Sequence, residues 1–88
     1  MIRIENWKLL LIDKDDEARQ TLSAFLENAD YSVLTVADGE SGIELCREES
    51  PQIILNEIDL PGIDGIEVLK SIKESYPYIE VIVISAYN

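Results

Sequence analysis

The sequence predicts an α/β fold in which a doubly wound parallel sheet is covered by helices on both faces. Short apolar segments alternate along the chain with segments of helical periodicity, which gives four strands and three helices. The first apolar segment, residues 9–12, contains no polar residue, as is typical of a central parallel strand buried on both faces. Three of the strands end abruptly in polar residues, and the carboxyl ends of parallel strands meet at one edge of a sheet.

Apolar periodicity and β-forming residues predict where the strands and helices lie along the chain. The expected order over the whole chain is a strand at residues 9–12, a helix at 18–29, a strand at 31–36, a helix at 41–49, a strand at 53–55, a helix from 64 to 75 and a strand at 79–84. The acids at Asp15, Asp16 and Glu17 complement the dipole of the first helix, which by itself accounts for their presence. Asp38-Gly39 ends the second strand.

Turn and cap residues separate the later elements. Pro51 ends the second helix, because the residue before a proline is driven out of the helical region. Pro61-Gly62 predicts a turn after the third strand, and Asp64 suits the N-cap of the third helix. Tyr76-Pro77 ends that helix and leads into the last strand, which is rich in valine and isoleucine.

Composition and charge exclude several classes of function. The 18 acidic residues outnumber the 7 basic ones, and a net charge of -11 repels nucleic acid and anionic membranes while favouring cationic partners or a divalent metal. No apolar run is long enough to cross a bilayer, and the first residues lack the apolar core of a signal peptide. The single cysteine, Cys46, lies on an apolar helical face and has no histidine to activate it, so we interpret it as a core thiol. A lone cysteine also fits a reducing compartment, so we expect a cytoplasmic protein.

Polar residues at three strand ends predict an acidic cleft with one lysine and one hydroxyl. Asp13-Lys14 follows the first strand, Asn56-Glu57 the third and Ser85 the fourth. This edge is where open α/β sheets bind ligands. A single glutamate after a strand is more often a solvated loop acid. The neighbouring strand ends are what make Glu57 a candidate functional residue.

These segments resemble the receiver domain of bacterial two-component response regulators, over nearly the whole chain. The resemblance rests on LLLID with the acids and Arg19 that follow, TVADGESGIEL, PQIILNEIDLPGIDG and VIVISAY. It implies a flavodoxin-like sheet with strand order 2-1-3-4. It also implies a module of phosphorelay signalling rather than an enzyme, with a sensor histidine kinase or a downstream output protein or domain as its partner.

In that family an aspartate after the third strand accepts a phosphoryl group, and Glu57 stands at this position. Ser85 matches the switch hydroxyl of the family. Asp13 matches the first of two acids that help to bind Mg²⁺, and Lys14 stands where the second is expected. The implied metal ligands are therefore Asp13, Glu57 and the backbone carbonyl of Asp59. The positive charge of Lys14 would disfavour a metal ion at this site.

Lys14 has two interpretations. Its ammonium group would act as a built-in cation beside Asp13 and Glu57, or its side chain would extend into solvent. Glutamate is one methylene longer than aspartate, and a nucleophile misplaced by about 1 Å can lose on the order of 100-fold in rate. Both departures favour a cleft that is not phosphorylated.

Length is the other departure from the family pattern. Receiver domains run to roughly 120 residues, and no segment here corresponds to their fifth strand, its lysine or the last helices. We interpret residues 1–88 as an incomplete receiver domain, its N-terminal three-quarters. The strand at residues 79–84 then has an exposed edge, through which we expect self-association if the chain ends at Asn88.

Three functional hypotheses follow. The first is an atypical receiver that is phosphorylation-independent or phosphomimetic because of Glu57. The second is an active Mg²⁺-dependent aspartyl-phosphate receiver that uses another acid, such as Asp13 or Asp59. The third is a fragment of a haloacid dehalogenase-type phosphatase, indicated by the D-x-D at Asp13 and Asp15. That motif is short, and the later lysine and acid pair of such enzymes have no room in this chain.

Overall fold

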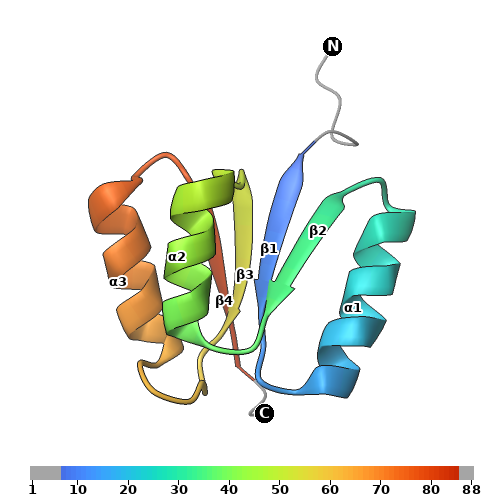
Figure 1. Ribbon diagram of the computed structural model, residues 1–88, viewed down its shortest axis with the longest axis horizontal. Coiled ribbons are helices and arrows are strands. Elements are labelled where there is room, and N and C mark those ends of the chain that lie inside the picture. The colour runs from blue at the N-terminus through green and yellow to red at the C-terminus, as the bar shows by residue number, and fades with distance from the viewer. Residues whose placement is uncertain (1–6, 86–88) are drawn as a thin grey trace.

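The computed structural model describes residues 7–85, in which four parallel strands form one sheet with helices on both faces (Figure 1). The elements are β1 (Lys8–Ile12), α1 (Asp16–Asn28), β2 (Ser32–Val36), α2 (Gly39–Glu49), β3 (Ile53–Glu57), α3 (Gly65–Ser75) and β4 (Glu80–Ile84). The strand order is β2-β1-β3-β4, which confirms the predicted topology. Residues 86–88, and with them the end of the VIVISAY segment, lie outside the described residues.

Aspartate caps fix where the helices begin. The Asp15 carboxylate accepts hydrogen bonds from the backbone N–H groups of the next turn, so α1 begins at Asp16, among the acids that were expected to start the helix. Asp38 caps α2 in the same way through the Ser41 N–H at 2.8 Å, and this helix begins two residues before its predicted start, at Gly39. The hydrogen bonds from Ser41 lower the pKa of Asp38. Asp64 caps α3 as predicted, in a capping box with Glu67.

The core lies between the sheet and the pair α2 and α3, which cover the same face (Figure 1). Its buried side chains come from the sheet, from α2 and α3 and from the connecting segments, and are Leu10, Ile12, Cys46, Ile54, Leu60, Val68, Ile72 and Ile79. Leu9 and Leu11 of β1 are buried on the opposite face. Both faces of β1 are therefore covered, as predicted for a central parallel strand.

β4 presents an apolar surface on the side of the sheet that α1 partly covers. In the described part of the chain β4 pairs with β3 alone, and Ile82 and Ile84 are 52% and 40% exposed. Phe25 of α1 is 69% exposed. Among the helices that the structure describes, none is long and apolar enough to cross a membrane.

Candidate functional site

The strand topology gathers the predicted cleft residues at one edge of the sheet. Asp13 directly follows β1, and Glu57 is the last residue of β3. The β3–β4 register pairs Glu57 with Ile84, so Ser85 lies one residue beyond the partner of Glu57. The carboxyl ends of these three strands are neighbours because β3 lies between β1 and β4.

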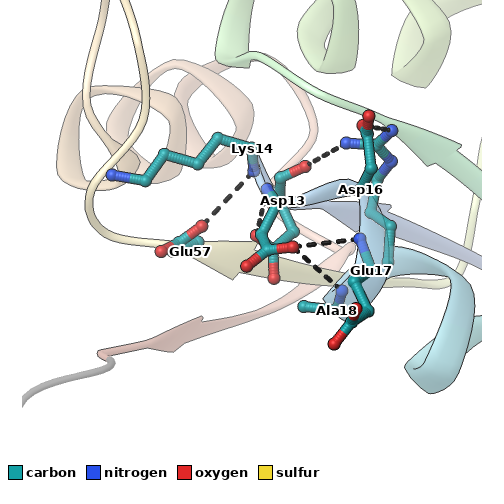
Figure 2. A network of polar contacts seen from close by, with 8 residues as sticks. Asp13, Lys14, Asp16, Glu17, Ala18 and Glu57 are labelled. Atoms are coloured by element: carbon teal, nitrogen blue, oxygen red, sulfur yellow. Dashed lines mark hydrogen bonds and ion pairs between the residues drawn. The ribbon is translucent and has the colours of Figure 1, made fainter.

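The carboxyl groups of Asp13 and Glu57 lie together at this edge (Figure 2). Partial burial, a side-chain hydrogen bond with Asp13 and the charge of Asp13 all raise the pKa of Glu57, in that order. The Lys14 backbone N–H, which donates to Glu57 Oε2 at 3.4 Å, and the Lys14 charge act in the opposite direction. The raised pKa shows that repulsion and burial outweigh the positive charge nearby.

A small hollow beside the carboxyl pair explains part of this burial. It has a volume of about 110 Å³ and is lined by Leu11, Ile12, Asp13, Leu22, Glu57 and Ile84. Most of these side chains are aliphatic, so water reaches Glu57 from fewer directions than it reaches a loop acid. A carboxylate in such surroundings is less well solvated than in water.

The Lys14 ammonium group binds the Asp59 carboxylate across the mouth of the site. The distance from Lys14 Nζ to Asp59 Oδ2 is 2.6 Å, and both side chains are about half exposed. The ion pair therefore joins the loop after β1 to the loop after β3. From the sequence we expected Asp59 to provide a backbone carbonyl to a metal or to act as an alternative phosphoryl acceptor, and we did not predict its ion pair with Lys14. The two residues carry opposite charges, but the sequence alone does not distinguish Asp59 from the other carboxylates near the strand ends.

The loop after β1 is held in place by three polar contacts. Asp13 Oδ1 accepts the Asp15 N–H at 2.9 Å, and the Asp13 carbonyl accepts Arg19 Nη1 at 2.8 Å. Arg19 also forms an ion pair with Asp16. The Asp15 carboxylate caps α1, and this use accounts for the second aspartate of the D-x-D motif without a phosphatase.

The loop after β3 is held from the buried side by Asn56. Asn56 Nδ2 donates to the Gly65 carbonyl at 2.8 Å, and the Gly65 N–H donates to the Ile58 carbonyl at 2.8 Å. A Cβ at residue 65 would lie 2.3 Å from the Glu57 carbonyl oxygen, so only glycine permits this close approach. The Ile58 N–H donates to the Ile84 carbonyl at 2.9 Å, which ties the same loop to β4.

The donor set fits a Mg²⁺ centre poorly. Asp13 and Glu57 provide two carboxyl groups of the type that Mg²⁺ accepts. Lys14 replaces a third acid, and the next carboxylate, that of Asp59, is bound to this lysine. Among residues 7–85 there is no group of three aspartate, glutamate, cysteine or histidine residues that could hold a metal ion.

Several known proteins are similar to this chain in sequence and in fold. The sequence model of the response regulator receiver domain matches residues 9–88. The transcriptional regulatory protein AfsQ1 of Streptomyces coelicolor is 40% identical over 80 residues, which are 91% of this chain and 35% of that protein. Sporulation initiation phosphotransferase F of Bacillus subtilis is 32% identical over 83 residues, which are 94% of this chain and 67% of that protein.

A solved structure agrees in fold. The crystal structure of the response regulator protein TrrA of Thermotoga maritima, in complex with Mg(2+)-BeF, superimposes with a TM-score of 0.91 and is 24% identical in sequence. The match covers 94% of this chain and 72% of the TrrA chain. The chain thus spans about a third of AfsQ1 and two thirds of sporulation initiation phosphotransferase F.

Proposed function

This chain belongs to the response regulator receiver domain family of phosphorelay signalling, and we propose that it is an atypical member that signals without being phosphorylated at Glu57. The observation that carries the proposal is the position of Glu57 at the end of β3, with its carboxyl group against Asp13. Glutamate places a negative charge one methylene further into the cleft than aspartate does. The residue therefore acts as a fixed charge, which either imitates a phosphoryl group or keeps the domain in one state.

The raised pKa of Glu57 supports the first part of this proposal, the absence of phosphorylation at this residue. A carboxylate that attacks phosphorus must be ionised and directed at the donor. Glu57 instead shares a hydrogen bond with Asp13, and burial opposes its ionisation. Its extra methylene also displaces the oxygen atoms from where an aspartate would hold them, and reaction rates fall steeply with such displacement.

Receiver domains bind Mg²⁺ beside the acceptor residue, and for this chain we propose that Mg²⁺ binds weakly. Lys14 adds a positive charge at the mouth of the site, and its ion pair with Asp59 already links the two loops of the site. The residues that would hold the ion are Asp13, Glu57 and the Asp59 carbonyl. When bound, Mg²⁺ would neutralise negative charge at this edge of the sheet.

As partners we propose a sensor histidine kinase or a downstream output protein or domain, in the cytoplasm. Receiver domains are signalling modules, and we propose that this chain has no catalytic activity of its own. A net charge of -11 opposes direct binding to nucleic acid. The relative AfsQ1 is a transcriptional regulator and much longer than this chain, so the response that this receiver controls would lie with a partner or a further domain.

Acetyl phosphate with Mg²⁺ tests the proposal, followed by measurement of the intact protein mass. We expect no added phosphoryl group, whereas sporulation initiation phosphotransferase F in the same reaction serves as the active control. A stable phosphoryl group that is retained in Glu57→Gln and maps to Asp13 or Asp59 would establish the second hypothesis, an active receiver that uses another acid. A phosphoryl group on Glu57 itself would refute both.

A further inference from the structure

A groove lies between α2 and α3, the two helices that run beside each other over one face of the sheet (Figure 1). Its volume is about 260 Å³. Its walls are formed by Glu40, Ile43, Glu44, Arg47, Ser71, Ser75 and Tyr76. None of these residues belongs to the acidic cleft at the strand ends, so the groove is a separate feature of the surface.

The apolar surface of the groove, its floor, is provided by Ile43 and Tyr76. Ile43 and Tyr76 are partly buried and pack against the hydrophobic core, so each leaves one side accessible from the groove. The Tyr78 ring meets the Tyr76 ring edge-on, with centroids 6.4 Å apart, and is 74% exposed. Two aromatic rings thus lie at the Tyr76 end of the groove. Rigid aromatic and aliphatic side chains of this kind anchor binding partners at low entropic cost.

The rim of the groove is acidic. Glu40 and Glu44 are exposed on α2, and Arg47 is the one basic residue among those that line the groove. Arg47 Nη2 lies 3.9 Å from Glu44 Oε1, and both side chains are about 70% exposed. An ion pair so long and so solvated holds neither partner firmly. A cation from outside can therefore displace Arg47 from Glu44.

We propose that this groove docks a basic amphipathic segment of a partner protein. One apolar side chain of the segment would lie between Ile43 and Tyr76, and its lysine or arginine side chains would reach Glu40 and Glu44. The charge of the chain, -11, favours a cationic partner and opposes nucleic acid and anionic membranes. The long aliphatic stems of lysine and arginine suit a groove with an apolar floor and an acidic rim.

Glu40 also contacts the loop that follows β3. Gly62 lies in this loop with a φ of 74°, and a Cβ at this position would lie 2.7 Å from Glu40 Oε2. The same loop carries Asp59, the partner of Lys14. A cation that binds Glu40 in the groove would therefore act on a side chain that touches the loop of the acidic cleft. The docking itself does not depend on whether Glu57 is phosphorylated.

The test is an amide NMR titration of the ¹⁵N-labelled chain with a short amphipathic helical peptide of leucine and lysine. A peptide with glutamate at every lysine position is the matched probe of charge. We expect the lysine peptide to shift the amide signals of Ile43, Glu44, Ser71 and Tyr76, and the glutamate peptide to shift none of them. Signals that move elsewhere, or that do not move at all, would overturn the proposal.

Two double variants distinguish docking from general attraction. Glu40→Gln with Glu44→Gln removes both rim charges and should weaken binding of the lysine peptide by about fivefold or more. Glu27→Gln with Asp30→Asn makes the same change in net charge at the far end of α1, where the residues are exposed. We expect less than about a twofold effect there. Equal weakening of peptide binding in the two double variants would show a general attraction to the negative charge of the chain. This result would overturn the proposal that the peptide docks in the groove.

Discussion

The Lys14 ammonium group lies 2.6 Å from Asp59 Oδ2, so an ion pair connects the loop after β1 with the loop after β3. The two side chains are 46% and 55% exposed, and a pair this solvated contributes less than about 1 kcal/mol to stability. The ion pair matters more for the electrostatics of the site than for the stability of the fold. It holds one positive charge at the mouth of the site, where this charge acts to lower the pKa of Glu57.

Lys14→Asp should raise the affinity of the site for Mg²⁺ by about 10- to 100-fold. The substitution changes the charge of the cleft by two units and frees the Asp59 carboxylate, and each factor of ten corresponds to about 1.4 kcal/mol. Without metal the variant should be less stable than the parent by about 1 kcal/mol, because it replaces an ion pair with repulsion. Titration calorimetry measures the affinity directly, and urea unfolding with and without Mg²⁺ measures the linked gain in stability.

Lys70→Asp is the matched control for this experiment. Lys70 is exposed on α3 and the substitution makes the same change in net charge. We expect little change in Mg²⁺ affinity there, because exposed charges far from the cleft are screened by salt. An equal gain in both variants would mean that net charge alone governs Mg²⁺ binding and that Lys14 has no local role.

Glu57→Gln should make the protein more stable at neutral pH. The folded protein raises the pKa of Glu57 above its ordinary value of 4.5, through burial and the neighbouring Asp13. The folded state therefore binds this proton more tightly than the unfolded chain does, and the free energy of unfolding falls as the pH rises from about 4.5 through the raised pKa. Glutamine does not titrate, so in the variant the free energy of unfolding should not fall with pH for this reason.

The measurement is urea unfolding of the parent and the variant at a series of pH values. The difference between them should be largest near pH 7 and should disappear toward pH 4.5, because the contributions of the other acids cancel. Glu27→Gln, an exposed residue of α1, should show no such trend. A constant difference across the whole range would show that Glu57 titrates as it does in the unfolded chain.

The apolar pattern was sufficient to predict the strands and the residues at their ends, whereas the order of the strands in the sheet was predicted from the family resemblance. Buried parallel strands are uninterrupted apolar runs, so the first polar residue after each run, such as Asp13, marks the edge of the sheet. The start of α2 was less well predicted, because the apolar spacing was given more weight than the capping residue Asp38. A cap acts through local hydrogen bonds to the first turn and leaves no trace in the apolar periodicity.

The partner of Lys14 could not be predicted from the sequence. A lysine side chain has four rotatable carbon–carbon bonds, and Asp13, Glu57 and Asp59 all lie near the same strand ends. Spacing along the chain does not distinguish between these carboxylates. The structure brings the ammonium group to Asp59, while the backbone N–H of the same lysine faces Glu57.

Asn56→Asp should destabilise the protein by about 2 kcal/mol or more. Asn56 is fully buried, and its amide nitrogen donates to the Gly65 carbonyl at 2.8 Å. A carboxylate would face that carbonyl without a proton to donate, in surroundings that solvate charge poorly. Asn56→Leu should cost less, because it also removes Oδ1, which has no hydrogen-bond partner within the described residues. Urea unfolding measures the loss of stability in each variant, and a larger loss in Asn56→Leu than in Asn56→Asp would contradict this account.

Ile82→Lys should weaken self-association of the 88-residue chain. β4 pairs only with β3 in the part of the chain that the structure describes, and Ile82 is 52% exposed beside the free edge. An apolar edge strand can pair with another copy, and a lysine there opposes such pairing through its charge. Sedimentation equilibrium should show association of the parent at concentrations on the order of 1 mM, weakened by about tenfold or more in the variant. Ile66→Lys makes the same substitution on α3, at a residue that is 38% exposed, and should associate as the parent does. A parent chain that stays monomeric over this range would refute pairing through β4.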